Sequence, residues 1–234
     1  MLILAFETSA KAGSVALWQS GKLLAESYQN TGLTHSQTLL SMAETMIKSC
    51  GLTPQDVQAV AVAAGPGSFT GVRIGVAAAK GFAWGLELPC CGVSTLEAMA
   101  ENLGIYEGTV VCTMDARRSQ VYNAIFRAEN GKLSRLTPDR AISLADLEKE
   151  LAEISGPLYL VGDGSNLTYQ TLHSTLPALI LPPEHRLHQR AAGVAAVAEK
   201  MLQNGEPCDA QSLQPNYLRL SQAERERLEK AQGV

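Results

Sequence analysis

Basic and aromatic residues are scarce in this sequence. Among 234 residues there are 19 Lys and Arg against 23 Asp and Glu, which gives a formal net charge of -4, and 5% of the residues are aromatic. A protein that holds a nucleic-acid backbone over its whole surface needs clustered Lys and Arg. The composition therefore argues against such a surface, and a partner would have to supply most of the contacts with any bound RNA.

Cysteine pairs at characteristic spacings are also missing. The five cysteines are an odd number and include no C-x-x-C pair, which fits neither a disulfide framework nor a zinc site. We therefore expect free thiols in a reducing compartment. Cys90 and Cys91 have no cationic neighbour in the sequence to lower their pKa, so they are expected to be buried and inert.

No segment has the features of a leader or a membrane span. The run from Met1 to Phe6 lacks a basic start and reaches Glu7 after five apolar residues, and no uninterrupted apolar run is long enough to cross a bilayer. Hydrophobic residues nevertheless make up 46% of the chain, which is enough for a sizeable core. The sequence predicts a cytoplasmic globular protein with no membrane partner.

The first half of the chain predicts strands followed by alternating helices and strands. Leu2 to Phe6 is a continuous apolar run typical of a buried strand, and a turn at Gly21 joins the next two strands, 13–18 and 22–28. Apolar residues at helical spacing follow Thr34, a predicted N-cap, and Gly51 ends that helix. Strand 57–64, helix 72–84 and strand 90–93 complete a βββαβαβ order.

The second half repeats this layout. The strand and hairpin of residues 109–136 match those of residues 2–28, so that Asp115 takes the place of Glu7. A helix at 143–154 with Ser143 as N-cap, a strand at 158–161 and helices near 165–173 and 188–202 follow. We predict an N-terminal lobe at 1–104 that binds a partner, a C-terminal lobe at 105–220 and a flexible tail at 221–234.

Two such lobes resemble the actin, sugar kinase and heat-shock ATPase superfamily (ASKHA), whose lobes are α/β and ribonuclease-H-like with mixed sheets. This likeness suggests a nucleotide cleft, in which Glu7 and Asp115 would face a metal. The turn containing Gly162 and Gly164 resembles the adenosine-binding turn of actin-like ATPases. The alternative is an ordinary strand-to-helix turn in which Ser165 is the N-cap.

Residues 65–75 form the most distinctive stretch, Gly-Pro-Gly-Ser-Phe-Thr-Gly-Val-Arg-Ile-Gly. It is not a nucleotide P-loop, because no lysine follows Gly71, and Pro66 and the glycine spacing exclude the dinucleotide fingerprint. Either the geometry of a tight connection requires the glycines, or the loop is a contact surface. Phe69, at the expected tip of the turn, favours a contact surface.

The histidines do not predict a metal site. His35 has no second histidine or cysteine at metal-ligand spacing, so a surface or capping role is favoured. His185 and His188 lie three residues apart beside Glu184, a spacing that only weakly indicates metal binding.

Five segments in order carry a more specific resemblance, which covers residue 1 to about residue 220. The chain resembles the TsaB (YeaZ) family, whose members take part in making threonylcarbamoyladenosine in tRNA and are paralogues of the catalytic subunit TsaD. The segments are Phe6-Glu7-Thr8-Ser9, Thr34-His35-Ser36, the stretch 65–75, Met114-Asp115-Ala116-Arg117 and Pro215-Asn216-Tyr217-Leu218-Arg219.

The resemblance implies a subunit without catalytic activity of its own. Where TsaD-type proteins carry metal-binding histidines, this chain has Thr95 and Met99, which are poor ligands for a hard cation. Arg117 and Arg118 also replace the glycines of a second phosphate turn. We expect no metal and no independently bound cofactor, with any ATP or ADP at the interface with TsaD. The alternative is a stand-alone actin-like ATPase or small-molecule kinase.

The resemblance further implies that the N-terminal lobe pairs with TsaD through its first two helices, and that the free protein forms a homodimer through the same surface. It also implies that TsaE joins the complex with TsaD, and that tRNA contacts this chain only through that complex. Val76→Arg is expected to abolish pairing and keep the fold. The candidate partner-binding residues are Leu39, Met42, Met46, Phe69, Arg73, Val76 and Lys80.

Overall fold

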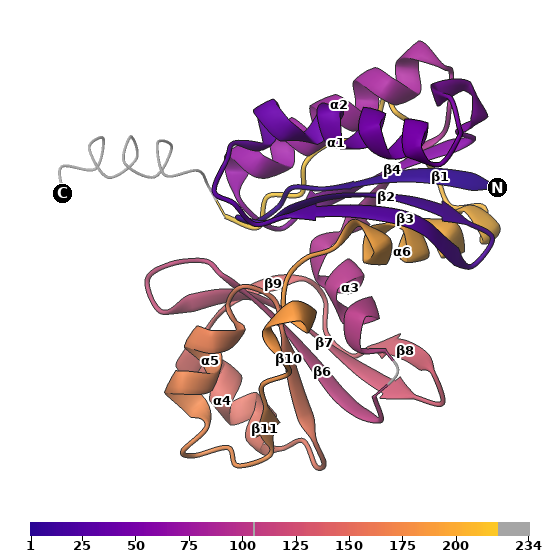
Figure 1. Ribbon diagram of the computed structural model, residues 1–234. Coiled ribbons are helices and arrows are strands. Elements are labelled where there is room, and N and C mark those ends of the chain that lie inside the picture. Colours follow the sequence, from indigo (N-terminus) through magenta and orange to yellow (C-terminus); the bar gives the residue numbers. More distant parts are fainter. Residues whose placement is uncertain (105, 220–234) are drawn as a thin grey trace, which may run out of the picture.

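The protein consists of two α/β lobes, shown by a computed structural model that describes residues 1–104 and 106–219 (Figure 1). The predicted tail at 221–234 lies outside these residues. The first lobe has a five-stranded sheet in the order β3-β2-β1-β4-β5. Its strands are β1 (Leu2–Glu7), β2 (Gly13–Gln19), β3 (Lys22–Gln29), β4 (Ala59–Gly65) and β5 (Cys90–Ser94).

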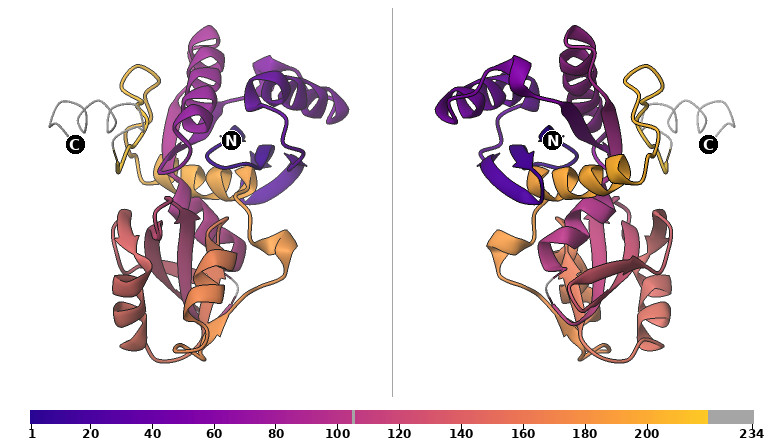
Figure 2. Two further views of the ribbon diagram at one scale, coloured as in Figure 1. Left: turned by 90° about the vertical axis from the view of Figure 1, so that its left-hand side faces the viewer. Right: turned by 90° about the vertical axis from the view of Figure 1, so that its right-hand side faces the viewer.

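Helices cover both faces of this sheet. Helices α1 (His35–Ser49) and α2 (Phe69–Gly85) lie on one face, and α6 (Ala191–Gln203) lies on the other (Figure 2). Side chains alternate between the faces of a strand. Leu4 and Phe6 accordingly pack in the core beneath α1 and α2, whereas Ile3 and Ala5 pack against α6.

The second lobe repeats the strand pairing of the first. Strand β6 pairs antiparallel with β7 and parallel with β10, as β1 pairs with β2 and β4, so the predicted duplication is confirmed. The third strand of the repeat is divided into two short strands, β8 and β9, which both pair with β7. The strands are β6 (Gly108–Asp115), β7 (Gln120–Glu129), β8 (Lys132–Arg135), β9 (Arg140–Ser143), β10 (Leu158–Val161) and β11 (Leu179–Ile180).

The remaining helices are short. Helices α4 (Leu144–Ala152) and α5 (Ser165–Leu172) belong to the second lobe, while α3 (Thr95–Ala100) leads from β5 towards β6. Ser143 caps α4 as predicted, because its Oγ accepts from the Asp146 backbone N–H. Thr34 precedes α1 as predicted but makes no side-chain capping bond. Single 3₁₀ turns occur at Pro54–Asp56, Glu101–Leu103 and Glu184–Arg186.

Helix α6 does not lie where the sequence prediction placed it. The predicted helix at 188–202 was assigned to the C-terminal lobe, but α6 packs on the sheet of the first lobe. Both surfaces consist of small side chains, such as Ala195 on the helix and Ala5 and Ala61 on the strands, and small side chains allow close contact. The chain therefore crosses back to the first lobe before α6, so the described residues of the predicted C-terminal lobe do not all belong to one spatial unit.

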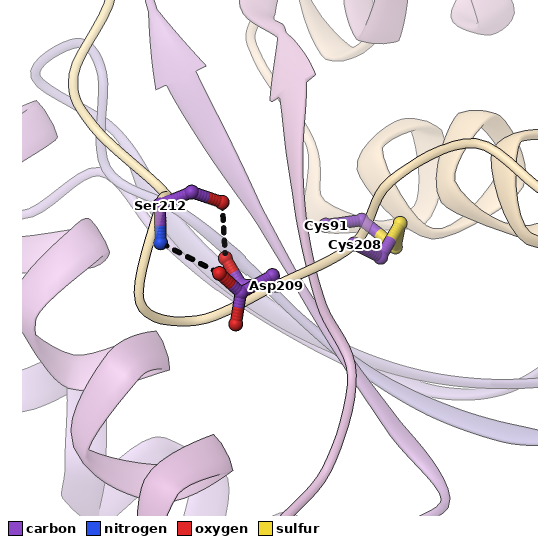
Figure 3. The surroundings of a disulfide bond; sticks show 4 residues. All are labelled: Cys91, Cys208, Asp209 and Ser212. Atoms are coloured by element: carbon purple, nitrogen blue, oxygen red, sulfur yellow. Dashed lines mark hydrogen bonds between the residues drawn. A yellow bond between two sulfur atoms is a disulfide. The ribbon is translucent and has the colours of Figure 1, made fainter.

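Two of the cysteines form a disulfide, which corrects the prediction of five free thiols. Cys91 in β5 is bonded to Cys208, which follows α6, and their Cα atoms lie 4.4 Å apart (Figure 3). Because the two residues are 117 positions apart, cysteine spacing could not reveal the pair. Cys90 is free and buried, and its burial raises the pKa of the thiol to about 12. Over the described ranges, no helix has the length and apolar character needed to cross a membrane.

Candidate functional site

A cleft of about 530 Å³ opens between the two lobes. Its first wall comes from the β1–β2 loop and the start of α2, and its second wall comes from the turn between β6 and β7 and from the end of β10. The lining residues are Ser9, Ala10, Lys11, Gly67, Ser68, Phe69, Thr70, Met114, Asp115, Ala116, Arg117, Tyr122 and Asp163.

Glu7 lies beneath this cleft and is fully buried at the end of β1. Its Oε1 accepts a hydrogen bond from the Ser9 backbone N–H at 2.6 Å, while Oε2 has no partner among the described residues. Burial raises the pKa of Glu7 to about 7, and the negative charge of Asp163 contributes in the same direction. The carboxyl group is thus partly protonated near neutral pH and is not among the residues that line the cleft.

Two aspartates do line the cleft. Asp115 is exposed, and its Oδ1 accepts from the Arg117 backbone N–H at 2.7 Å. Asp163 accepts from the Gln189 side-chain amide at 2.9 Å, and burial raises the pKa of its carboxyl group. Sequence reasoning missed Asp163 as a site residue, although its place between Gly162 and Gly164 at the end of a strand could have indicated it.

Gly162 and Gly164 do not line the cleft, because both pack directly on β6. Gly162 has a φ of +111°, and a Cβ there would collide with the carbonyl oxygen of Thr113. The backbone N–H of Gly164 donates to that same oxygen at 3.0 Å. Gly164, rather than Ser165, is the N-cap of α5. The glycines are therefore required by an ordinary strand-to-helix turn, which was the alternative interpretation.

The glycine-rich stretch 65–75 packs within the first lobe in the same way. A Cβ at Gly71 would collide with the Thr8 carbonyl oxygen, and one at Gly75 with the Thr8 hydroxyl. Thr8 Oγ1 donates to the Gly71 carbonyl at 2.8 Å, and the Ser68 backbone N–H donates to the Ser9 carbonyl at 2.6 Å. Close packing of α2 against the β1–β2 loop thus accounts for these glycines.

Phe69 is the first residue of α2 rather than the tip of a loop, and its ring stacks on Tyr217. The ring centroids are 3.9 Å apart and the planes differ by 3°. Arg73 Nε donates to the Tyr217 hydroxyl at 2.7 Å, and its guanidinium lies 5.0 Å from the Phe69 centroid. Sequence reasoning missed that Tyr217 packs against Phe69 and Arg73, because no local pattern links it to residues about 140 positions earlier.

The other candidate partner-binding residues are mostly unavailable. Leu39, Met42, Met46 and Val76 are buried in the core of the first lobe, so their side chains form no free surface. The expectation that Val76→Arg keeps the fold is therefore corrected, because the substitution would place a guanidinium in that core. Lys80 Nζ donates to the carbonyls of Gln211 and Leu213.

The histidines make local contacts. His35 Nε2 lies 2.8 Å from the Ala10 carbonyl, and His188 Nε2 lies 2.8 Å from Glu184 Oε1. His185 belongs to a 3₁₀ turn. In the part of the chain that the structure describes, no group of three His, Cys, Asp or Glu side chains is arranged to hold a metal ion.

Thr95 and Met99, at the positions compared with the TsaD histidines, are both fully buried. Met99 packs with Leu96, Met114 and Val161 in a core cluster that spans both lobes. A Cβ at Gly162 would lie 3.1 Å from Met99 Cε, so Met99 also fills the space beneath the second-lobe turn. Both side chains are thus enclosed by the protein, Met99 within the core cluster and Thr95 as a buried polar group.

Comparisons with known proteins show the family of this chain. Residues 28–227 match the family model described as TsaD, tRNA N6-adenosine threonylcarbamoyltransferase. The tRNA threonylcarbamoyladenosine biosynthesis protein TsaB of Bacillus subtilis is 34% identical over 225 residues, which cover 96% of each chain. The chain belongs to the TsaB (YeaZ) family. The solved structure of YeaZ from Pseudomonas aeruginosa superposes with a TM-score of 0.72 and 25% identity, covering 93% of this chain and 99% of that one.

More distant structures share only the fold with this TsaB family member. The ethanolamine utilization protein EutJ from Carboxydothermus hydrogenoformans has a TM-score of 0.51 and 15% identity, and covers 83% of this chain and 89% of its own. The predicted fold class is confirmed: the protein has the two-lobed actin-like fold with mixed sheets.

Proposed function

We propose that the protein is a non-catalytic assembly subunit for threonylcarbamoylation of the adenosine next to the anticodon in tRNAs that read codons beginning with A. It acts in the cytoplasm by pairing with TsaD and by helping to recruit TsaE. Family membership supports the pathway. The observation that carries the non-catalytic role is the burial of Thr95 and Met99 in the core, at the positions where TsaD-type proteins have metal-binding histidines.

The proposed TsaD-binding surface is the exposed face of α2. Arg73, Ala77, Gly81 and Trp84 recur every three or four residues and are all exposed, with Trp84 at 71%. Nothing lies within 4 Å of a Cβ built at Gly81, so a partner helix has room to approach the backbone. A second copy of the chain uses the same face when TsaD is absent.

Two of the predicted partner-binding residues fit this surface. Arg73 is exposed at its start, and Phe69, which is half-buried, lies one turn earlier. Lys80 is half-buried and holds the C-terminal segment through its bonds to Gln211 and Leu213, so it supports the surface indirectly.

The chain has no cofactor of its own in this proposal, and ATP or ADP lies at the junction with TsaD. The fully buried Glu7 supports this, because a carboxyl group beneath the cleft wall is poorly placed to contact a nucleotide-bound cation. The net charge of -4 supports contact with tRNA only through the complex.

The test is a reconstituted reaction containing TsaD, TsaE, threonylcarbamoyl-adenylate, ATP and unmodified tRNA, with and without this protein. We expect modified tRNA only in the complete mixture, and no ATP hydrolysis by this protein alone. Full modification without the protein would contradict the assembly role. Robust ATP turnover by the isolated chain would instead favour a stand-alone ATPase or kinase.

A further inference from the structure

The chain segment after α6, residues 208–219, runs over the first lobe and ends on the second. We call it the C-terminal strap. At its start the strap is held to β5 by the Cys91–Cys208 disulfide (Figure 3). The Cys90 backbone N–H also donates a hydrogen bond to the Cys208 carbonyl. Further along, Leu213 is buried in the core beneath α2. The first half of the strap is therefore fixed to the first lobe.

The strap then reaches the mouth of the cleft. The Asn216 backbone N–H donates to the carbonyl of Ala64 at the end of β4, at 2.6 Å. Gly65 leaves room for this contact, because a Cβ there would lie 2.5 Å from the Asn216 carbonyl oxygen. The next residue, Tyr217, stacks on Phe69, which lines the first wall of the cleft.

The last contact crosses to the other lobe. Arg219 Nη1 donates to the carbonyl oxygen of Ala116 at 2.6 Å. Ala116 lines the second wall of the cleft, in the turn between β6 and β7. Within three residues, the strap thus contacts one wall through Tyr217 and the opposite wall through Arg219.

We propose that the C-terminal strap is a latch that holds the two lobes together across the mouth of the cleft. The chain itself crosses between the lobes at α3 and again just before α6, whereas the strap adds a non-covalent connection at the cleft. Opening of the cleft requires the Arg219 bond to Ala116 to break or Tyr217 to leave Phe69. A ligand or partner segment that enters the cleft therefore competes with the latch.

The latch can be tested on the full chain without TsaD, by a distance between the lobes, so its failure is distinguishable from failure of the proposed assembly role. Cys50, a free and exposed thiol beside α1, carries one nitroxide label, and Ala145→Cys, at an exposed position of α4, carries the second. Mass spectrometry confirms two labels, because the buried thiols of Cys90 and Cys112 have raised pKa values and react slowly. Labelled protein is diluted with an excess of unlabelled protein, so that two labelled copies rarely meet in one homodimer. Pulsed electron resonance then measures the distance distribution within a single chain.

We expect one narrow distribution for the protein with the strap intact. Arg219→Ala should add a population at longer distance, and the double variant Tyr217→Ala with Arg219→Ala should enlarge it. Tyr217→Phe, which retains the ring that stacks on Phe69, should keep the narrow distribution. If Arg219→Ala and the double variant both leave the distribution unchanged, the latch does not exist.

Ser212→Ala is the matched control, because Ser212 lies in the strap and, among residues 1–104 and 106–219, its hydrogen bonds go to Asp209 of the same segment. It should leave the distance distribution unaltered. Equal broadening in Ser212→Ala and Arg219→Ala would mean general loosening of the strap and would overturn the latch. Arg219→Ala removes only a partly exposed side chain, so it remains informative if the double variant fails to fold.

Discussion

The buried carboxyl group of Glu7, in the first lobe, lies close enough to Asp163, on the second wall of the cleft, for the charge of Asp163 to affect the pKa of Glu7. Burial is the main reason why the pKa of Glu7 is raised to about 7, and the charge of Asp163 adds to it. Burial also raises the pKa of Asp163. Glu7 is therefore only partly ionised near neutral pH.

The first prediction concerns the pH dependence of stability at Glu7. A raised carboxyl pKa means that the folded state binds the proton more tightly than the unfolded state. The stability that protonation of Glu7 gives the fold is complete below pH 4.5 and is lost as pH rises to about 7. Glu7→Gln removes the penalty of a buried charge. At pH 8 we expect the variant to be more stable than the parent, by on the order of 3 kcal/mol.

Urea unfolding at pH 5 and pH 8 measures this difference for Glu7→Gln. Glu44→Gln is the control, because Glu44 is an exposed carboxylate paired with Lys48 on the surface of α1. It should change the free energy of unfolding little at either pH. A Glu7→Gln effect of equal size at both pH values would contradict a protonation equilibrium at Glu7.

The second prediction compares two glycines of α2. Gly71→Ala places a methyl group against the Thr8 carbonyl oxygen, so it should destabilise the protein by about 1–3 kcal/mol. Gly81→Ala lies in open space on the same helix and should stabilise the protein by roughly 0.5–1 kcal/mol. Thermal unfolding distinguishes the two, and a similar change in both variants would argue against close packing at Gly71.

The third prediction concerns the disulfide. Peptide mapping without reductant should recover Cys91 linked to Cys208. The double variant Cys91→Ala with Cys208→Ala should lose on the order of 3–5 kcal/mol, because the bond closes a long loop in the unfolded chain. Reduction should bring the parent to a similar stability, whereas Cys50→Ala, at an exposed free thiol, should have little effect. Recovery of Cys91 and Cys208 as free thiols in the peptide map would show that the bond does not form.

The fourth prediction tests the exposed face of α2. Ala77→Arg introduces a bulky charge at an exposed position of the proposed TsaD-binding surface. We expect TsaD affinity to fall at least tenfold, which corresponds to about 1.4 kcal/mol, with unfolding unchanged. Calorimetry or surface plasmon resonance measures the affinity. Ala145→Arg, at an exposed position of α4 in the other lobe, should bind TsaD normally, and equal losses in both variants would contradict the assignment.

Several features were predictable because they depend on local patterns. The continuous apolar run Leu2 to Phe6 predicted a buried strand, Gly21 predicted the turn of a hairpin, and the repeat beginning at Thr109 predicted the second lobe. All three features are present in the structure. Helical periodicity also found the apolar side of α1, including Met42. It could not show whether a partner or the protein's own sheet covers that side. Periodicity shows which residues share one face of a helix, but not what packs against that face.

The amino-acid sequence by itself determined most of the strands and helices in order, the duplication and the family, since these follow from turn chemistry, periodicity and ordered motifs. It did not indicate α3, β11 or the division of the third repeated strand into β8 and β9. Only the tertiary structure decided that α6 returns to the first sheet, that Cys91 meets Cys208, and that Tyr217 covers Phe69. Each of these contacts joins segments more than 100 residues apart. Such contacts depend on which folded surfaces fit together, and no local pattern specifies that.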